Sequence, residues 1–232
     1  MSTTTTTDMP LRVSVFDYGA GNLHSLIKSL ERDRTLVRVD TDPRAAVTDV
    51  DALVLPGVGA FSPAAERLAS GLQPMRTALQ RGLPCLGICL GMQLLFDASD
   101  EGPGEGLGVF AGRVTRLTSA RVPQIGWNAL EHVSDPLLIE AGLDIAYFAN
   151  SFVCRVATGS LTLERSSAEH VSPVTAWSEH DGDRFPAVVR RGQVVGMQFH
   201  PEKSSSAGVR TVHAFLDAAV QARAMGLLPV EA

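Results

Sequence analysis

Apolar residues in the first hundred positions alternate between continuous runs and helix-spaced patterns. Continuous apolar runs, typical of strands buried on both faces, lie at 11–16, 52–56 and 83–88, with a shorter run at 37–39. Apolar positions at helical spacing lie at 23–32, 63–71, 75–82 and 90–99. This alternation of strands and helices predicts a parallel sheet that is covered by helices on both faces.

The second half of the chain has a different pattern. Beyond the glycine-rich stretch 102–108, short strand-like runs separated by turns lie at 113–117, 146–156, 174–180, 185–191 and 193–199, and a final helix at 213–224. We therefore expect an α/β fold: a single domain with a mixed, mostly parallel sheet flanked by helices, and antiparallel strands added in the second half. Residues 1–10 are expected to form a disordered polar tail, and the domain to span 11–232.

Composition and charge exclude several function classes. The chain has 232 residues, of which 45% are hydrophobic, so a sizeable core can form, and its net charge of -5 gives no basic surface for nucleic acid or an anionic membrane. No apolar stretch approaches the roughly 18 to 20 residues of a membrane span, and the polar start has no apolar signal region. Three cysteines, an odd number, are a poor basis for disulfides and fit a reducing cytoplasm.

The segment Gly-Ile-Cys-Leu-Gly at 87–91 has the residue types of a nucleophile on a sharp strand-to-helix turn. Glycines on both sides allow a close backbone approach, and the following helix directs its positive end at Cys89. The N–H of Leu90 is then placed to donate to an oxyanion. A buried structural cysteine is the more common explanation of such a motif taken alone. For Cys85 and Cys154, which lack flanking glycines, we expect that structural role.

A base and an oxyanion donor are also available. His200 and Glu202 stand two residues apart after an apolar strand, so in extended backbone both side chains fall on the same side, and Glu202 can orient the imidazole. The alternative is a surface turn. The loop after the strand at 52–56 offers backbone N–H groups at Gly57 and Val58 as a second donor, although an ordinary glycine turn is as plausible in isolation. Cysteine, base and loop all follow strand ends, where open α/β sheets bind ligands.

The segment DYGAGN at 17–22 also follows a strand. It contains Gly-x-Gly, but the third glycine of a dinucleotide-binding fingerprint is absent, and His24 stands in its place. We therefore expect no nucleotide to bind there.

Taken together, several motifs resemble a known family. GICLGMQ, LPGVG and the late HPE are similar to class I (triad) glutamine amidotransferases, and DYGAGNLHS, LPGVGAF, PQIGWN, YFANSF and GMQFHPEKS resemble the glutaminase subunits of imidazole glycerol phosphate synthases. The motifs run from residue 17 to 204 in the family's order. The resemblance implies hydrolysis of L-glutamine to glutamate and ammonia, without a cofactor, in the cytoplasm. It also implies a heterodimer in which ammonia is channelled to a (β/α)8-barrel synthase subunit, which makes imidazole glycerol phosphate and aminoimidazole carboxamide ribotide in histidine biosynthesis.

The resemblance also implies residue roles. Cys89 is expected to be the nucleophile, His200 the base and acid, and Glu202 the carboxylate that orients it. Further expected roles are glutamine contacts at Gln93 and at the backbone of Ser151 and Phe152, and places near the synthase interface for Trp127, Tyr147 and Lys203. We also expect the Gly57–Val58 peptide to turn away from the thiol when no partner is bound.

Three positions depart from the family's usual pattern. Gln124 and Asn150 stand where histidine is common, and Phe152 replaces a common tyrosine. The segments of Gln124 and Asn150 are expected to face the partner, so both residues are placed at the interface. Because neither amide titrates, we expect coupling between the subunits not to depend on a titrating residue at these sites.

Other functions remain as alternatives. Pro84 to Cys89 with His-Pro-Glu superficially resembles a zinc deaminase signature, but the order and the cysteine spacing differ, and we expect no metal. A triad glutaminase that serves a different acceptor subunit, or a γ-glutamyl hydrolase, differs only in its acceptor. A non-enzymatic descendant is disfavoured because Cys89, His200 and Glu202 are all present.

Overall fold

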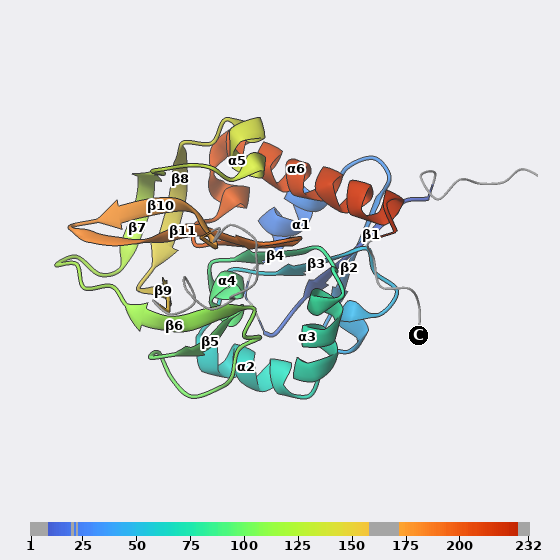
Figure 1. Ribbon diagram of the computed structural model, residues 1–232, viewed down its shortest axis with the longest axis horizontal. Helices are drawn as coiled ribbons and strands as arrows, with labels where there is room; N and C mark the ends of the chain where they lie inside the picture. The colour runs from blue at the N-terminus through green and yellow to red at the C-terminus, as the bar shows by residue number, and fades with distance from the viewer. Residues whose placement is uncertain (1–8, 20, 22, 158–171, 227–232) are drawn as a thin grey trace, which may run out of the picture.

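A seven-stranded mixed sheet forms the centre of the molecule (Figure 1). The computed structural model describes residues 9–19, 21, 23–157 and 172–226, so positions 1–8 of the predicted tail lie outside the described residues. The strand order is β10-β11-β12-β4-β3-β1-β2. These strands are β1 (Leu11–Phe16), β2 (Thr35–Asp40), β3 (Ala52–Leu55), β4 (Cys85–Ile88), β10 (Val174–His180), β11 (Asp183–Arg191) and β12 (Val194–Met197).

The strands from the first half are parallel, and the antiparallel pairs come from the second half, as the sequence predicts. Strands β12, β4, β3, β1 and β2 run parallel to one another, whereas β11 pairs antiparallel with both β10 and β12. Strands β4 and β12 are neighbours along their whole lengths, with Cys85 opposite Val194 and Ile88 opposite Met197. The segments that follow these two strands therefore leave the sheet side by side.

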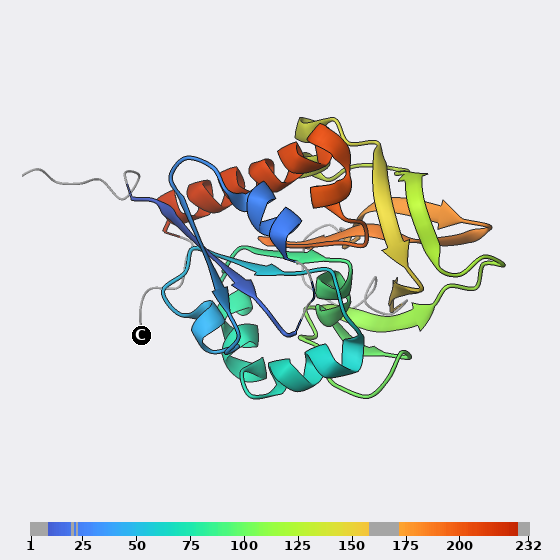
Figure 2. The same ribbon diagram turned by 180° about the vertical axis from the view of Figure 1, so that it is seen from behind.

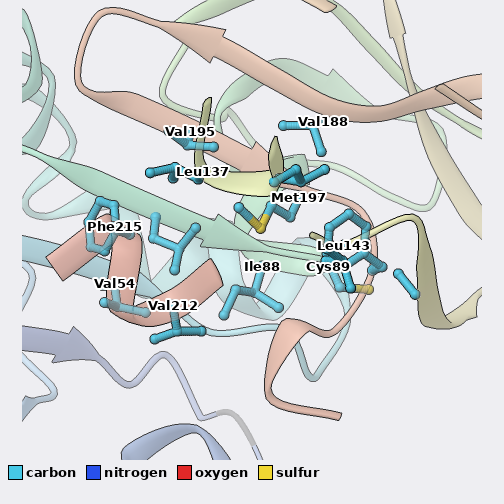
Figure 3. Close-up of a cluster of buried hydrophobic side chains, with 14 of the residues drawn as sticks. Val54, Ile88, Cys89, Leu137, Leu143, Val188, Val195, Met197, Val212 and Phe215 are labelled. Atoms are coloured by element: carbon cyan, nitrogen blue, oxygen red, sulfur yellow. The ribbon is translucent and has the colours of Figure 1, made fainter. Parts of the chain in front are cut away.

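Helices cover both faces of the sheet, and Figures 1 and 2 show the two layers from opposite sides. One layer contains α1 (His24–Leu30), α5 (Pro136–Ala141) and α6 (Ser205–Ala224). The other contains α2 (Phe61–Ala69), α3 (Leu72–Gln80) and α4 (Leu90–Leu94). Each layer encloses its own apolar core, and the core beneath α6, with Ile88, Met197 and Phe215 in it, reaches Cys89 at its edge (Figure 3).

Two smaller sheets lie at one end of the molecule, away from α3 (Figure 1). One joins β5 (Phe96–Ser99), β6 (Phe110–Arg116) and β9 (Phe152–Val156), and the other is the antiparallel pair β7 (Gln124–Ala129) and β8 (Ile145–Asn150). In the β7–β8 pair, Gln124 lies opposite Asn150 and Trp127 opposite Tyr147.

The helix predicted over 90–99 is wrong in its second half. Helix α4 ends at Leu94, and Phe96–Ser99 forms β5 against β6, where the rings of Phe96 and Phe110 pack 5.6 Å apart. The backbone N–H of Leu107 bonds the Leu94 carbonyl oxygen at 2.7 Å, so a distant loop satisfies the helix end. Periodicity in a short apolar run cannot separate these outcomes. The sequence pattern also missed β7 and α5, and α6 begins eight residues before the predicted start.

Candidate active site

Cys89 occupies the turn between β4 and α4. Its backbone angles are φ 46° and ψ -102°, a region that residues with a side chain rarely adopt, and its N–H donates to the carbonyl oxygen of Met197 at 2.7 Å. Such strain costs of the order of 1–3 kcal/mol and persists only where the surrounding structure enforces it. The neighbouring strand β12 therefore helps to hold the turn.

The two flanking glycines are needed because the backbone is closely approached on both sides. A Cβ on Gly87 would lie 2.7 Å from the carbonyl oxygen of Gly91, and a Cβ on Gly91 would lie 2.0 Å from that of Leu55. Neither position has room for a methyl group, since the obstructing atoms are backbone. The sequence-based explanation of these glycines is confirmed.

His200 and Glu202 follow β12 and meet as expected. Nδ1 of His200 lies 2.8 Å from Oε1 of Glu202, and both side chains are buried. The backbone is not extended throughout, however: Pro201–Lys203 forms one 3₁₀ turn, and this turn brings Glu202 back to the imidazole. The predicted meeting is confirmed, but its predicted cause is wrong.

The turn that carries His200 is anchored to β8. The N–H of His200 donates to the carbonyl oxygen of Tyr147 at 2.9 Å. The Ser204 hydroxyl donates to the His200 carbonyl oxygen at 2.7 Å and accepts the Tyr147 N–H at 2.9 Å. These three hydrogen bonds tie the backbone of His200 to β8, once directly and once through the Ser204 hydroxyl.

The environment of His200 favours its protonated form. Burial alone would lower the pKa of His200, but hydrogen bonds to Cys89 and Glu202, together with the negative charges of these groups, raise that pKa to about 9. At neutral pH the imidazole therefore carries a proton beside Sγ of Cys89. An imidazolium in this position can give its proton to a leaving group.

A cavity of about 340 Å³ brings the expected groups together. Its wall contains the Cys89 turn, the His200 segment, the loop after β3 and the start of β9. The lining residues are Gly57, Val58, Gly59, Cys89, Leu90, Gln93, Glu101, Ala149, Asn150, Ser151, Phe152, His200 and Lys203. The N–H groups of the first turn of α4 have no partner inside the helix, so this wall can offer donors beside the thiol.

The expected substrate contacts lie in the same wall. Nε2 of Gln93 and Nδ2 of Asn150 each lie 3.2 Å from the carbonyl oxygen of Phe152, to which both donate. The two amides thus hold the Phe152 carbonyl in place, and Phe152 lines the cavity together with Ser151. The fixed peptide groups there can recognise the polar end of a small ligand.

Three side chains at this site were not predicted from the sequence. The buried amide of Gln198 donates through Nε2 to Cys89 Sγ at 3.6 Å, Glu101 lines the cavity and accepts the Phe61 N–H, and Tyr18 donates its hydroxyl to the Pro56 carbonyl oxygen. Gln198 could have been found from the sequence, because it is a polar amide residue at the end of an otherwise apolar strand run. Glu101 and Tyr18 reach the site only through the fold.

The residues expected near a partner divide into two groups. Trp127, whose side chain is 55% exposed, packs edge-on against Tyr147 with ring centres 6.0 Å apart, and Lys203 is exposed. Gln124 and Asn150 are also predicted to lie at the interface, but their side chains are buried, at 3% and 5% exposure, so they are not part of the exposed surface of this chain. Because side chains alternate along a strand, β7 and β8 turn these two amides inward and leave their neighbours outside.

Neither Cys85 nor Cys154 lines this cavity, and a second, larger cavity lies elsewhere. Burial raises the pKa of the Cys85 thiol, and burial with the nearby charge of Cys89 raises that of Cys154, which keeps both thiols neutral. A larger cavity, of about 520 Å³, lies where β12 begins and α3 ends. It has no cysteine or histidine in its lining, so the smaller cavity is the candidate site.

Two further structural observations concern metals and membranes. Within residues 9–19, 21, 23–157 and 172–226, no three His, Cys, Asp or Glu side chains are grouped so that they could hold a metal ion. None of the helices in the described part of the chain is long and apolar enough to cross a membrane.

The chain is similar in sequence to one protein family and to several named proteins. Residues 14–216 match the model of the family described as glutamine amidotransferase class-I. The imidazole glycerol phosphate synthase subunit HisH of Leifsonia xyli subsp. xyli is 42% identical over 202 residues, which cover 85% of this chain and 94% of the relative. The HisH subunit of Symbiobacterium thermophilum is 45% identical, with 86% and 90% covered.

Solved structures share the fold at lower identity. A structure described as a glutamine amidotransferase superposes with a TM-score of 0.66 at 21% identity, covering 89% of this chain and 98% of that chain. The PurLQS structure of Thermotoga maritima gives a TM-score of 0.66 at 18% identity, with 90% and 99% covered. These two likenesses concern the fold alone.

Proposed function

Because the chain belongs to the class-I glutamine amidotransferases, among the HisH subunits of imidazole glycerol phosphate synthase, we propose that it hydrolyses L-glutamine with a Cys89, His200 and Glu202 triad. The observation that carries this proposal is that Cys89 and His200 line one cavity, while Glu202 holds Nδ1 of the His200 imidazole. As such a subunit it takes part in histidine biosynthesis and works with a synthase subunit.

The first half of the reaction forms a thioester. The Cys89 thiolate, paired with the His200 imidazolium, attacks the carboxamide carbon through Sγ, and the carbonyl π electrons move to oxygen. The N–H groups of Leu90 and of the Gly57–Val58 loop stabilise this oxyanion, each donor contributing roughly 3 to 4 kcal/mol. When the oxyanion collapses, the C–N bond breaks and His200 gives its proton to the leaving nitrogen, which departs as ammonia.

The second half regenerates the enzyme. A water molecule attacks the γ-glutamyl thioester, and neutral His200 takes one of its protons. Collapse of the second oxyanion breaks the C–S bond, which releases glutamate and returns the thiolate to the imidazolium. Glu202 holds the imidazole in orientation through its 2.8 Å bond to Nδ1 and stabilises its charge in both halves.

The rest of the cavity suits the amino-acid end of glutamine. Among the residues that line the cavity, Glu101 is the acidic one, and its carboxylate can pair with the α-ammonium group. Gln93, Ser151 and Phe152 line the same cavity and can supply neutral hydrogen-bonding groups. A substrate that lacks the α-ammonium group is therefore expected to bind less tightly.

The outer face of β7 and β8 suits the synthase subunit, which we take to be a (β/α)8-barrel. Three large apolar side chains are exposed there, Ile125 at 68%, Trp127 at 55% and Ile145 at 49%. Contact at this face can reach the imidazole, because the Tyr147 backbone in β8 holds His200 and Ser204. Three free cysteines in the described residues support a cytoplasmic location.

The experiment that tests the proposal measures glutamate release from L-glutamine by the purified chain. It is run with and without the barrel synthase subunit of the same genome, and with a nucleotide ligand of that subunit. Strong stimulation by the liganded partner, with imidazole glycerol phosphate formed, supports the whole proposal. Hydrolysis that ignores this partner would leave the glutaminase and point to another acceptor subunit.

A further inference from the structure

Tyr18 lies beside the loop that supplies the proposed oxyanion donors. It follows the carboxyl end of β1, which is the sheet neighbour of β3, and its side chain is only 4% exposed. The hydroxyl donates to the carbonyl oxygen of Pro56, and the ring packs edge-on against Phe16 with centres 5.8 Å apart. The phenol therefore fixes a backbone carbonyl one residue before Gly57.

The anchored loop contacts the reacting groups directly. A Cβ on Gly57 would lie 2.9 Å from Cε1 of His200 and 2.9 Å from Cγ2 of Ile88, so this backbone sits against the imidazole. Gly57 and Val58 also line the cavity that contains the Cys89 thiol. A small shift of this loop would therefore move donors relative to both the thiol and the base.

Side-chain packing alone does not fix the loop formed by Pro56, Gly57 and Val58, because part of it borders an empty space. A second cavity of about 130 Å³ lies against the same loop, lined by residues of α1, the loop and the His200 segment: Leu23, Ser25, Leu26, Pro56, Gly57, Val58, Glu202 and Lys203. A void removes the contacts that would otherwise resist displacement. The Tyr18 hydroxyl is thus well placed to fix the start of the loop.

We propose that Tyr18 is a positioning residue for glutamine hydrolysis, whose hydroxyl holds the Pro56 carbonyl so that the following N–H groups meet the oxyanion. The inference rests on the proposed function. Burial, and then the negative charge of Cys89, raises the pKa of Tyr18 well above its ordinary value, so the phenol remains a donor at any pH at which the enzyme works. Because the oxyanion forms in the transition state, the effect falls on kcat rather than on KM.

The test is Tyr18→Phe in the complex with the synthase subunit. This variant keeps the ring against Phe16 and removes only the hydroxyl. We expect kcat for glutamine hydrolysis to fall about tenfold, less than the loss of a whole oxyanion donor, while KM changes less than about twofold. Synthesis driven by added ammonium and the rate of Cys89 alkylation by iodoacetamide are expected to match the wild type, because neither uses the oxyanion donors.

Thr211→Val is the matched control. It also removes one buried hydroxyl that donates to a backbone carbonyl, that of Ala207 at 3.0 Å in α6. We expect it to keep the wild-type kcat. A Tyr18→Phe enzyme with wild-type kcat, or a fall that the control shares or that follows the folded fraction, would overturn the inference. A wild-type complex that does not hydrolyse glutamine would instead reject the proposed function.

Discussion

Cys89 differs from the other two cysteines in its surroundings more than in its burial. All three side chains are at most 6% exposed, but Cys89 alone of the three lines the candidate cavity, next to a protonated imidazole and the amide of Gln198. Cys85 and Cys154 lie in the core beneath α2 and α3, in apolar surroundings. Reactivity at one cysteine is therefore a property of its site.

Thiol alkylation tests this difference. Iodoacetamide at neutral pH is expected to modify Cys89 and to leave Cys85 and Cys154 intact, because burial raises the pKa of both these thiols. Peptide mass spectrometry of the folded protein identifies the site, and Cys89→Ala serves as the unlabelled control. Modification of Cys85 or Cys154 at a similar rate would contradict the account.

The raised pKa of His200 predicts the sign of a pH effect on stability. The folded-state pKa of about 9 lies above the ordinary 6.5, so His200 stabilises the fold fully below about pH 6.5 and loses that contribution as the pH rises through 9. The difference amounts to about 3 kcal/mol. Urea unfolding of wild type and His200→Gln, at pH 6.5 and 9.5, measures it as the change in their stability difference. An equal difference at both pH values would contradict the raised pKa.

At the scale of elements, the turn between β4 and α4 was predictable and much around it was not. The two glycines near Cys89 can be read from the sequence as a sign of close backbone contact. In the structure, the Leu55 carbonyl oxygen leaves no room for a side chain at Gly91. Tyr18 and Glu101 carry no such signal, because each enters the site from a distant segment. Gln124 and Asn150 point inward because of which alternate residues of β7 and β8 face the core. This could not be predicted for β7, because β7 was not recognised as a strand.

Gly91→Ala tests the packing of this turn. The new methyl group would meet the Leu55 carbonyl oxygen, which is backbone and cannot turn aside, so we expect a loss of about 3 kcal/mol in the free energy of unfolding, or more. Gly21→Ala is the control, because a Cβ there meets no atom within 4 Å. The measurement is chemical denaturation of both variants. Equal stability of Gly91→Ala and wild type would show that the turn can relax.

At the scale of the whole molecule, the fold brings an apolar outer face and a polar cavity onto the same two-stranded sheet. Strand β8 carries Tyr147 toward Trp127 on its outer side, while its backbone holds His200 and its end borders the cavity. The alternating pattern of the first half predicted the central sheet, since buried parallel strands have a strong signal. The positions of the two small sheets depend on tertiary contacts, which the hydrophobic pattern of the sequence does not predict.

Trp127→Ala is expected to weaken binding to the synthase subunit by about 30-fold or more, because a large exposed aromatic at a protein interface often contributes 2 kcal/mol or more. Stability of the isolated chain should change little, since this side chain is 55% exposed. Leu36→Ala, on β2 at the far edge of the central sheet and 58% exposed, is the control. Titration calorimetry with the partner measures both, and equal affinities for the two variants would move the interface elsewhere.

The central claim is that Cys89 performs the attack on glutamine. The most direct measurement is the rate of glutamate formation by the liganded complex with Cys89→Ala, beside ammonium-driven synthesis by the same preparation. We expect a fall of at least about a thousandfold in glutamine hydrolysis, with ammonium-driven synthesis retained, because loss of a nucleophile removes the covalent route. Glutamine hydrolysis that continues at a rate near wild type would contradict it.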